Sequence, residues 1–196
     1  LKMIISGCDY GLINLEAPLM PSNCSAVLKA GPALNQISSA FNSVKEMGFN
    51  LVSLANNHIC DYGIEGLTLT ITELDRRGIK SIGVSMDFHH LFDPVVVSVN
   101  DKKVAFFAAA EAQFGCFKEE LDEFGYAWLL SEDLRKSIVY WNDRVDFIVL
   151  SAHAGLEHVA VPLPEWRTIY RGFVDLGVDV IVGHHPHVPQ GIEYYG

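Results

Sequence analysis

The sequence predicts an α/β fold built on a largely parallel sheet. Apolar stretches of strand length alternate along the chain with segments that have the period of amphipathic helices. The chain has 196 residues, and 49% of its side chains are apolar, which is enough to bury a sizeable core. Because no internal repeat, low-complexity tract or linker interrupts this pattern, we expect residues 1–196 to form a single domain.

The alternation fixes the principal elements in chain order. Helices are expected to end where Gly78 and Gly177 can adopt the left-handed backbone conformation, and proline suits the first turn of a helix. The four main strands are predicted at residues 11–13, 50–54, 146–150 and 179–182, and the helices at residues 32–47, 64–77, 132–142 and 164–176.

The middle of the chain has a different pattern. Two runs of β-branched and aromatic residues, at 94–99 and 103–108, flank the turn signal Asn100-Asp101-Lys102. This arrangement predicts an antiparallel hairpin, which we assign to a second sheet. Residues 113–128 lack periodicity and are rich in Phe, Glu and Gly, so they are predicted to form a long surface loop near the functional site.

Composition excludes several classes of function. With 24 acidic and 14 basic residues, the chain has a net charge of −10 and no basic stripe that could bind the phosphate backbone of a nucleic acid. A polyanionic substrate would therefore need local positive charge, which bound divalent cations could supply. The four cysteines have no C-x-x-C spacing, which excludes a zinc ribbon and a thioredoxin motif.

Side chains of the metal-binding type follow all four main strands. Ligands of open α/β sheets bind beyond the carboxyl ends of the strands, so these side chains are predicted to gather at one edge. Imidazole, carboxylate and amide oxygen suit one or two ions of zinc, manganese or iron. The residues are Asn14 and Glu16, then Asn56, Asn57 and His58, then His153, and finally His184, His185 and His187.

The His-Pro-His unit at residues 185–187 adds to this prediction. In an extended segment, side chains at i and i+2 point the same way, and the proline between them stiffens the backbone. We therefore expect His185 and His187 to face one metal centre from the same side.

Each of these features also has an ordinary structural explanation. His153 alone can be a hydrogen-bonded core residue, Asn56-Asn57 a turn, and Glu16 a solvated acid at a strand exit. Four strand exits that all carry ligand-type residues nevertheless favour a metal site. His89 and His90 lie outside this group and are predicted to be surface residues.

Three motifs resemble those of the bacterial capsule-synthesis family CapA/PGA_cap, which is associated with poly-γ-glutamate synthesis. They are N-L-E-A-P-L at residues 14–19, A-N-N-H-x-x-D-x-G at residues 55–63, and G-x-H-P-H-V-x-Q at residues 183–190. They occur in order, and the resemblance extends over nearly the whole chain.

The resemblance implies the fold of calcineurin-like metallophosphoesterases: an α/β/β/α sandwich of two sheets flanked by helices, with a dinuclear metal centre at the strand ends. It implies that Asn57, His153, His185 and His187 are metal ligands and that His58 is the acid that protonates the leaving group. Glu16 or Asn14 stands at the position of the metal-bridging aspartate, and we prefer Glu16 because a bridge between two cations benefits from negative charge. Substrate contacts are assigned to Asn14, Asn56, Asp61, Glu157 and His184.

The sequence departs from the family pattern at several positions. The Gly-Asp strand that opens the pattern has no clear counterpart before Asp9, and the strand-like residues 191–195 are not followed by the usual Ser-Leu-Gly-Asn-Phe strand. We expect truncation of these terminal strands. Ala154 and His158 replace the usual tryptophan and tyrosine. We expect the protein at the bacterial cell envelope or outside the cell if an N-terminal segment has been removed, and in the cytoplasm otherwise.

Three functions remain open at this stage. The first is a metal-dependent hydrolase or transferase that acts on a phosphoester or on a γ-glutamyl or other envelope polymer. The second is a non-catalytic accessory module that binds an anionic polymer on its metals and assists a membrane synthase or exporter. The third is a sugar or nucleotide phosphatase unrelated to capsules.

Overall fold

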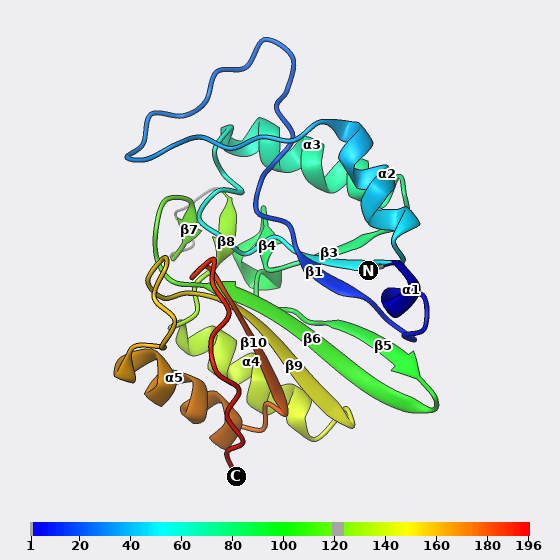
Figure 1. Cartoon of the computed structure of the whole chain (residues 1–196), viewed down its shortest axis with the longest axis vertical. Coiled ribbons are helices and arrows are strands. Elements are labelled where there is room, and N and C mark those ends of the chain that lie inside the picture. Colours follow the sequence, from blue (N-terminus) through cyan, green and yellow to red (C-terminus); the bar gives the residue numbers. More distant parts are fainter. Residues whose placement is uncertain (1, 119–123) are drawn as a thin grey trace.

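Two stacked sheets form the centre of the molecule, and helices cover both outer faces (Figure 1). The computed structural model describes residues 2–118 and 124–196. Helices α2 (Ser38–Glu46) and α3 (Gly63–Asp75) lie over the first sheet, and α4 (Glu132–Asn142) and α5 (Pro164–Asp175) lie over the second. The α/β/β/α architecture implied by the sequence is therefore confirmed.

The first sheet consists of two consecutive β-α-β units. Its strands β1 (Leu12–Asn14), β2 (Leu51–Ser53) and β3 (Lys80–Ile82) are parallel and lie in the order β1-β2-β3. Every residue of β2 is buried, as expected for a central strand with both faces covered. The sequence analysis predicted β1 and β2 but not β3, which is short and begins with an exposed lysine.

The second sheet has the order β10-β9-β6-β5. Strands β5 (Val95–Val99) and β6 (Lys102–Ala110) form the predicted antiparallel hairpin, and both turn residues have the positive φ angles of a tight hairpin turn. Strands β9 (Phe147–His153) and β10 (Val180–His184) continue the sheet as parallel neighbours of β6. The hairpin thus shares its sheet with β9 and β10. The sequence analysis had instead placed these two strands in one sheet with β1 and β2, apart from the hairpin.

Strand β6 connects the two hydrophobic clusters of the core because its side chains alternate between the faces of the sheet. Ala105, Phe107 and Ala109 belong to the cluster formed with α4 and α5. Phe106, Ala108 and Ala110 contact the cluster formed with the first sheet, α2 and α3. The alanines on the inner face leave room for the first sheet to pack closely.

The prediction of a long loop at residues 113–128 is wrong in part, because two strands of a third, small sheet lie within it. Strands β4 (Val84–Ser85), β8 (Gly125–Ala127) and β7 (Cys116–Phe117) lie in the order β4-β8-β7. Tyr126 of β8 is fully buried, and its hydroxyl donates to the carbonyl of Glu111 over 3.0 Å and accepts from the amide of Gln113 over 2.8 Å. Residues 119–123 of that prediction lie outside the described residues.

The helices mostly match their predicted limits. Ser131 caps α4 by accepting from the amide of Asp133, and α5 begins at a proline. Helix α2 begins at Ser38 rather than at residue 32, because residues before it run alongside the segment after β1, where Gln36 pairs with Leu19. The short helix α1 (Lys2–Ile5) was not predicted, a single helical turn η1 (Phe88–His90) carries His89 and His90, and residues 191–195 do not form the expected strand. None of the helices in the described residues has the length and apolar character needed to cross a membrane.

Gly83 lies where the two main sheets approach each other, and it tests how closely they pack. Its φ angle is +83°, and a Cβ atom there would lie 2.7 Å from Ala55 Cβ and 2.8 Å from Ala108 Cβ. We predict that Gly83→Ala lowers the free energy of unfolding by about 2 to 4 kcal/mol, measured by urea denaturation. Gly172→Ala in α5 is the control, because a Cβ atom added there would meet no neighbouring group within 4 Å. This variant is expected to leave the free energy of unfolding unchanged or to raise it. Equal stability of the two variants would contradict this account of the sheet contact.

Candidate functional site

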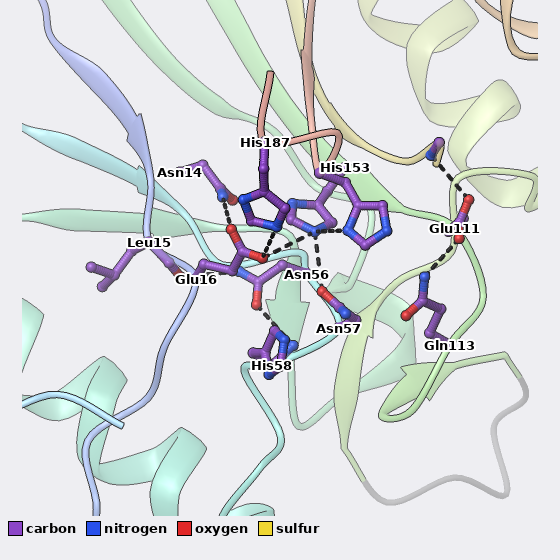
Figure 2. A network of polar contacts seen from close by, with 12 residues as sticks. Asn14, Leu15, Glu16, Asn56, Asn57, His58, Glu111, Gln113, His153 and His187 are labelled. Atoms are coloured by element: carbon purple, nitrogen blue, oxygen red, sulfur yellow. Dashed lines mark hydrogen bonds and ion pairs between the residues drawn. The ribbon is translucent and has the colours of Figure 1, made fainter. Parts of the chain in front are cut away.

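The polar residues predicted from the strand exits come together at one edge of the two main sheets. His153 is the last residue of β9 and His184 the last of β10, while Glu16 follows β1 by two residues. The turn after β2, which lies in the same sheet as β1, supplies Asn57 and His58. Figure 2 shows the side chains of Glu16, Asn57, His153 and His187 directed towards one another.

His153 is at the centre of this group. Its Nε2 atom lies 3.1 Å from Asn57 Oδ1, 3.1 Å from His185 Nδ1 and 3.7 Å from Glu16 Oε1. The residue is only 1% exposed. Four donor atoms from four separate segments of the chain thus surround one small buried volume.

Glu16 and His185 also belong to a second, overlapping group with His187. The ligand atoms of these three residues all lie within 4.8 Å of one another, and Glu16 Oε1 is 3.7 Å from His187 Nε2. Asn14 Nδ2 lies 3.5 Å from the other carboxylate oxygen of Glu16. Glu16 is therefore shared between the group around His153 and the group that includes the more exposed His187.

Burial favours the uncharged form of the His153 and His184 imidazoles. It lowers the pKa of His153 to about 2, helped by the neighbouring histidines, and it also lowers the pKa of His184. Within the described part of the chain, His153 Nδ1, His184 Nε2 and Asn14 Oδ1 are buried without a hydrogen-bond partner. Neutral imidazole is the form that binds transition metals.

The donor set fits a divalent transition metal. A neutral ring has one N–H, so His153 Nε2 can donate to only one of the three acceptor-type atoms around it. Asn57 Oδ1 and the Glu16 carboxylate are both acceptors, so at least one of them faces His153 Nε2 without a proton between the two atoms. Ligand atoms that surround a tetrahedral zinc at about 2.1 Å lie about 3.4 Å apart, which is close to the separations found here.

The His-Pro-His segment reaches the site by a backbone path that differs from the predicted one. It is not extended, because the φ angles of His185 and His187 are 92° and 56°. The left-handed conformation is unusual for residues other than glycine and is often found at functional sites. The carbonyl of Pro186 accepts from the amide of His158 over 2.7 Å, which attaches this bend to the loop after β9.

His58 belongs to a separate polar network beside the central group. Its Nδ1 atom lies 2.8 Å from Oδ2 of Asp61, a carboxylate that is fully buried. Asp61 Oδ2 also accepts from the amide of Leu34 over 2.7 Å, and Oδ1 forms an ion pair with Lys29. The sequence analysis did not single out Lys29, because nothing in its local sequence distinguishes it from a surface lysine.

The residues assigned to substrate contacts differ in where they lie. The amide of Asn56 is buried and used within the fold: Nδ2 donates to the carbonyl of Leu15 over 3.0 Å, and Oδ1 accepts from the amide of His58 over 3.1 Å. Glu157 is exposed in the loop after β9, and no described hydrogen bond or ion pair connects it to the central group. His89 and His90 are exposed on η1, as expected for surface residues.

Glu111 is a polar residue at the same edge that the sequence analysis missed. It directly follows β6, its amide donates to the carbonyl of His153 over 3.0 Å, and its carboxylate accepts from the amide of Gly155 and from Gln113 Nε2 (Figure 2). The signal was available, because the rule applied to the other strand exits also applies to β6. It was overlooked because β6 was assigned only to a hairpin.

Comparisons with known proteins agree with the motifs. The family model described as "Bacterial capsule synthesis protein PGA_cap" matches residues 1–196. The "Capsule biosynthesis protein CapA" of Bacillus anthracis is 29% identical, over 97% of this chain and 48% of its own length. The "PGA biosynthesis protein CapA" of Bacillus subtilis is 28% identical, over 98% of this chain and 51% of its own length. The chain therefore spans about half the length of these curated relatives.

A crystal structure of a hypothetical protein from Thermus thermophilus has a similar fold. The TM-score is 0.53 at 16% sequence identity, and the match covers 96% of this chain and 61% of that chain. This similarity supports the fold alone.

The hydrogen bonds of Asn56 give a test of how the site is held together. We predict that Asn56→Ala lowers the free energy of unfolding by about 2 to 4 kcal/mol, because it leaves the carbonyl of Leu15 and the amide of His58 buried without partners. Asn42→Ala is the matched control: its amide accepts a hydrogen bond from Arg77 at the surface, and its loss should change stability by less than about 1 kcal/mol. Chemical denaturation of both variants decides the matter, and similar values would show that Asn56 does not link the two strand exits.

Proposed function

The chain belongs to the bacterial capsule synthesis protein family PGA_cap, and from that premise we propose that it is a metal-dependent hydrolase or transferase. Its substrate would be a phosphoester or a γ-glutamyl or other envelope polymer. The observation that carries the proposal is the convergence of Asn57, His185 and Glu16 on the buried, uncharged His153.

The two overlapping groups of donor atoms support a site for two divalent cations of manganese, zinc or iron. Asn57 and His153 would hold one cation and His187 the other, with Glu16 and His185 near both. Glu16 would serve both cations, because its carboxylate lies 3.7 Å from an imidazole nitrogen in each group and carries negative charge. Bound cations would activate a water molecule and stabilise the developing oxyanion.

His58 is proposed to carry the proton of the reaction. Its Nδ1 atom is held by Asp61, which leaves Nε2 to exchange a proton with the substrate. In its charged imidazolium form, with protons on both ring nitrogens, His58 would deliver the Nε2 proton to the leaving oxygen or nitrogen and return to the neutral ring with its proton on Nδ1. Asp61 would stabilise the charged imidazolium and fix the orientation of the ring.

The proposed partners follow from charge and family. An anionic polymer would be attracted to the cations despite the net charge of −10 on the chain. Relatives that are named for capsule and PGA biosynthesis favour a role beside a membrane-bound synthesis complex at the cell envelope.

Elemental analysis of the purified protein tests the metal site. We predict about two equivalents of transition metal after incubation with manganese or zinc, and their loss in the double variant His185→Ala, His187→Ala. The double variant His89→Ala, His90→Ala removes two exposed histidines on η1 and should keep the full metal content. One equivalent would indicate a mononuclear site, and no metal in the unmodified protein would contradict the proposal.

Replacement of His58 separates catalysis from simple binding. We predict that His58→Gln reduces turnover of aryl phosphoesters or γ-glutamyl peptides by at least about 100-fold, because general acid catalysis is lost. Metal content should stay unchanged, since the described contacts of His58 are with Asp61, Lys29 and the amide oxygen of Asn56. His90→Gln is the control and should retain full activity.

A non-catalytic accessory module would give a different result in the same assays. It would bind metal and an anionic polymer without metal-dependent turnover, and His58→Gln would leave its polymer binding unchanged.

A further inference from the structure

A long loop between β1 and α2 brings a buried lysine to the His58 network. Residues 20–37 extend beyond α3 and then return to the core (Figure 1). Leu28 is fully exposed, yet the side chain of the next residue, Lys29, is only 7% exposed. Lysine is rarely buried unless its charge is paired, so its environment needs an explanation.

The polar contacts described for Lys29 are all with the segment that carries His58. Its Nζ atom forms an ion pair with Asp61 Oδ1, lies 3.4 Å from the carbonyl oxygen of Asn57, and lies 3.2 Å from His58 Nδ1. The ammonium group also lies 5.6 Å from the centre of the Phe114 ring.

Several contacts of the loop of residues 20–37 are made with Asp61. Its carbonyl accepts from the amide of Val27 over 2.9 Å, and its carboxylate accepts from the amide of Leu34 and pairs with Lys29. A fully buried carboxylate is costly without a compensating charge. Lys29 supplies that charge, so Asp61 can remain an anion beside His58.

The protonation pattern of His58 follows from these contacts. An ionised carboxylate only accepts hydrogen bonds, so the 2.8 Å contact between Asp61 Oδ2 and His58 Nδ1 requires a proton on Nδ1. Lys29 has only N–H donors, so its ammonium group, which pairs with Asp61 Oδ1 and donates to the carbonyl of Asn57, cannot accept the Nδ1 proton. The lone pair of neutral His58 is then on Nε2.

We propose that Lys29 is a positioning residue, which keeps Asp61 ionised and thereby holds His58 in the tautomer with the proton on Nδ1. The inference rests on the proposed catalytic role of His58 and extends it to the loop of residues 20–37. Lys29 does not touch the reacting atoms, because it acts through Asp61. The loop that carries Lys29 contacts the turn after β2.

Nitrogen-15 NMR of the histidine side chains, in zinc-loaded protein at neutral pH, tests this proposal directly. The signal of His58 is assigned by its absence from the His58→Gln spectrum. We expect Nδ1 protonated and Nε2 unprotonated in the unmodified protein, a mixture of the two tautomers in Lys29→Met, and the original pattern in Lys29→Arg. Protonation at Nε2 alone in the unmodified protein, or an unchanged pattern in Lys29→Met, would overturn the proposal.

Kinetics give a second readout. Lys29→Met should lower kcat about tenfold with KM changed by less than about twofold, because the orientation and tautomer of the acid are affected and substrate binding is not. Lys29→Arg should restore most of the activity, and Lys136→Met, which removes an exposed lysine on α4, should have no effect. A rise in KM at constant kcat would assign Lys29 to substrate binding and overturn the positioning role.

Two further measurements keep the test decisive. If Lys29→Met does not fold, the double variant Lys29→Met, Asp61→Asn removes the unpaired buried charge. Mixed tautomers are expected in that variant, and Nδ1 protonation alone would refute the proposal. If the unmodified protein turns over no substrate, the proposed function fails, but the NMR result still decides whether Lys29 sets the tautomer of His58.

Discussion

The close approach of ligand-type atoms at the edge where the two main sheets meet is the constraint on which the rest of the structure depends. His153 Nε2 has three acceptor-type neighbours within 3.7 Å, from Asn57, His185 and Glu16. Lone pairs that face one another without a proton between them repel, so this arrangement persists only where the surrounding fold holds the atoms in place. The strands supply that rigidity, because the donors come directly after strands that are paired with their neighbours in each sheet.

The spacing between the sheets is set by small residues and secured by main-chain contacts. Ala108 and Ala110 on β6, together with Gly83, allow the first sheet to approach the second. The bends after β9 and β10 are then joined to each other, since the amide of Ala154 donates to the carbonyl of His184 over 3.2 Å. A shift of the second sheet would therefore move the donors after β9 and β10 together.

The sequence was informative where one local signal was sufficient. Long apolar runs predicted β2, β9 and β10, the helical period predicted α4 and α5, and the strand-end rule identified the residues that gather around His153. Strands of two or three residues such as β4, β7 and β8 have too few positions to show a period. Lys29 pairs with a residue far along the chain, Asp61, and the left-handed bend at His185 depends on contacts with the loop after β9, so neither could be inferred locally.

The charge balance of the site links its two proposed roles, catalysis and polymer binding. Glu16 supplies the carboxylate of both donor groups, and burial of Asp61 is offset by Lys29. With two divalent cations held by Glu16 and neutral ligands, the centre would carry a net positive charge inside a chain of net charge −10. Such a centre attracts anionic substrates whether or not it transforms them. What converts binding into catalysis is a group that takes up and releases a proton at one fixed nitrogen. The network of Lys29, Asp61 and His58 has the chemistry to provide one, because it leaves Nε2 of His58 for that exchange.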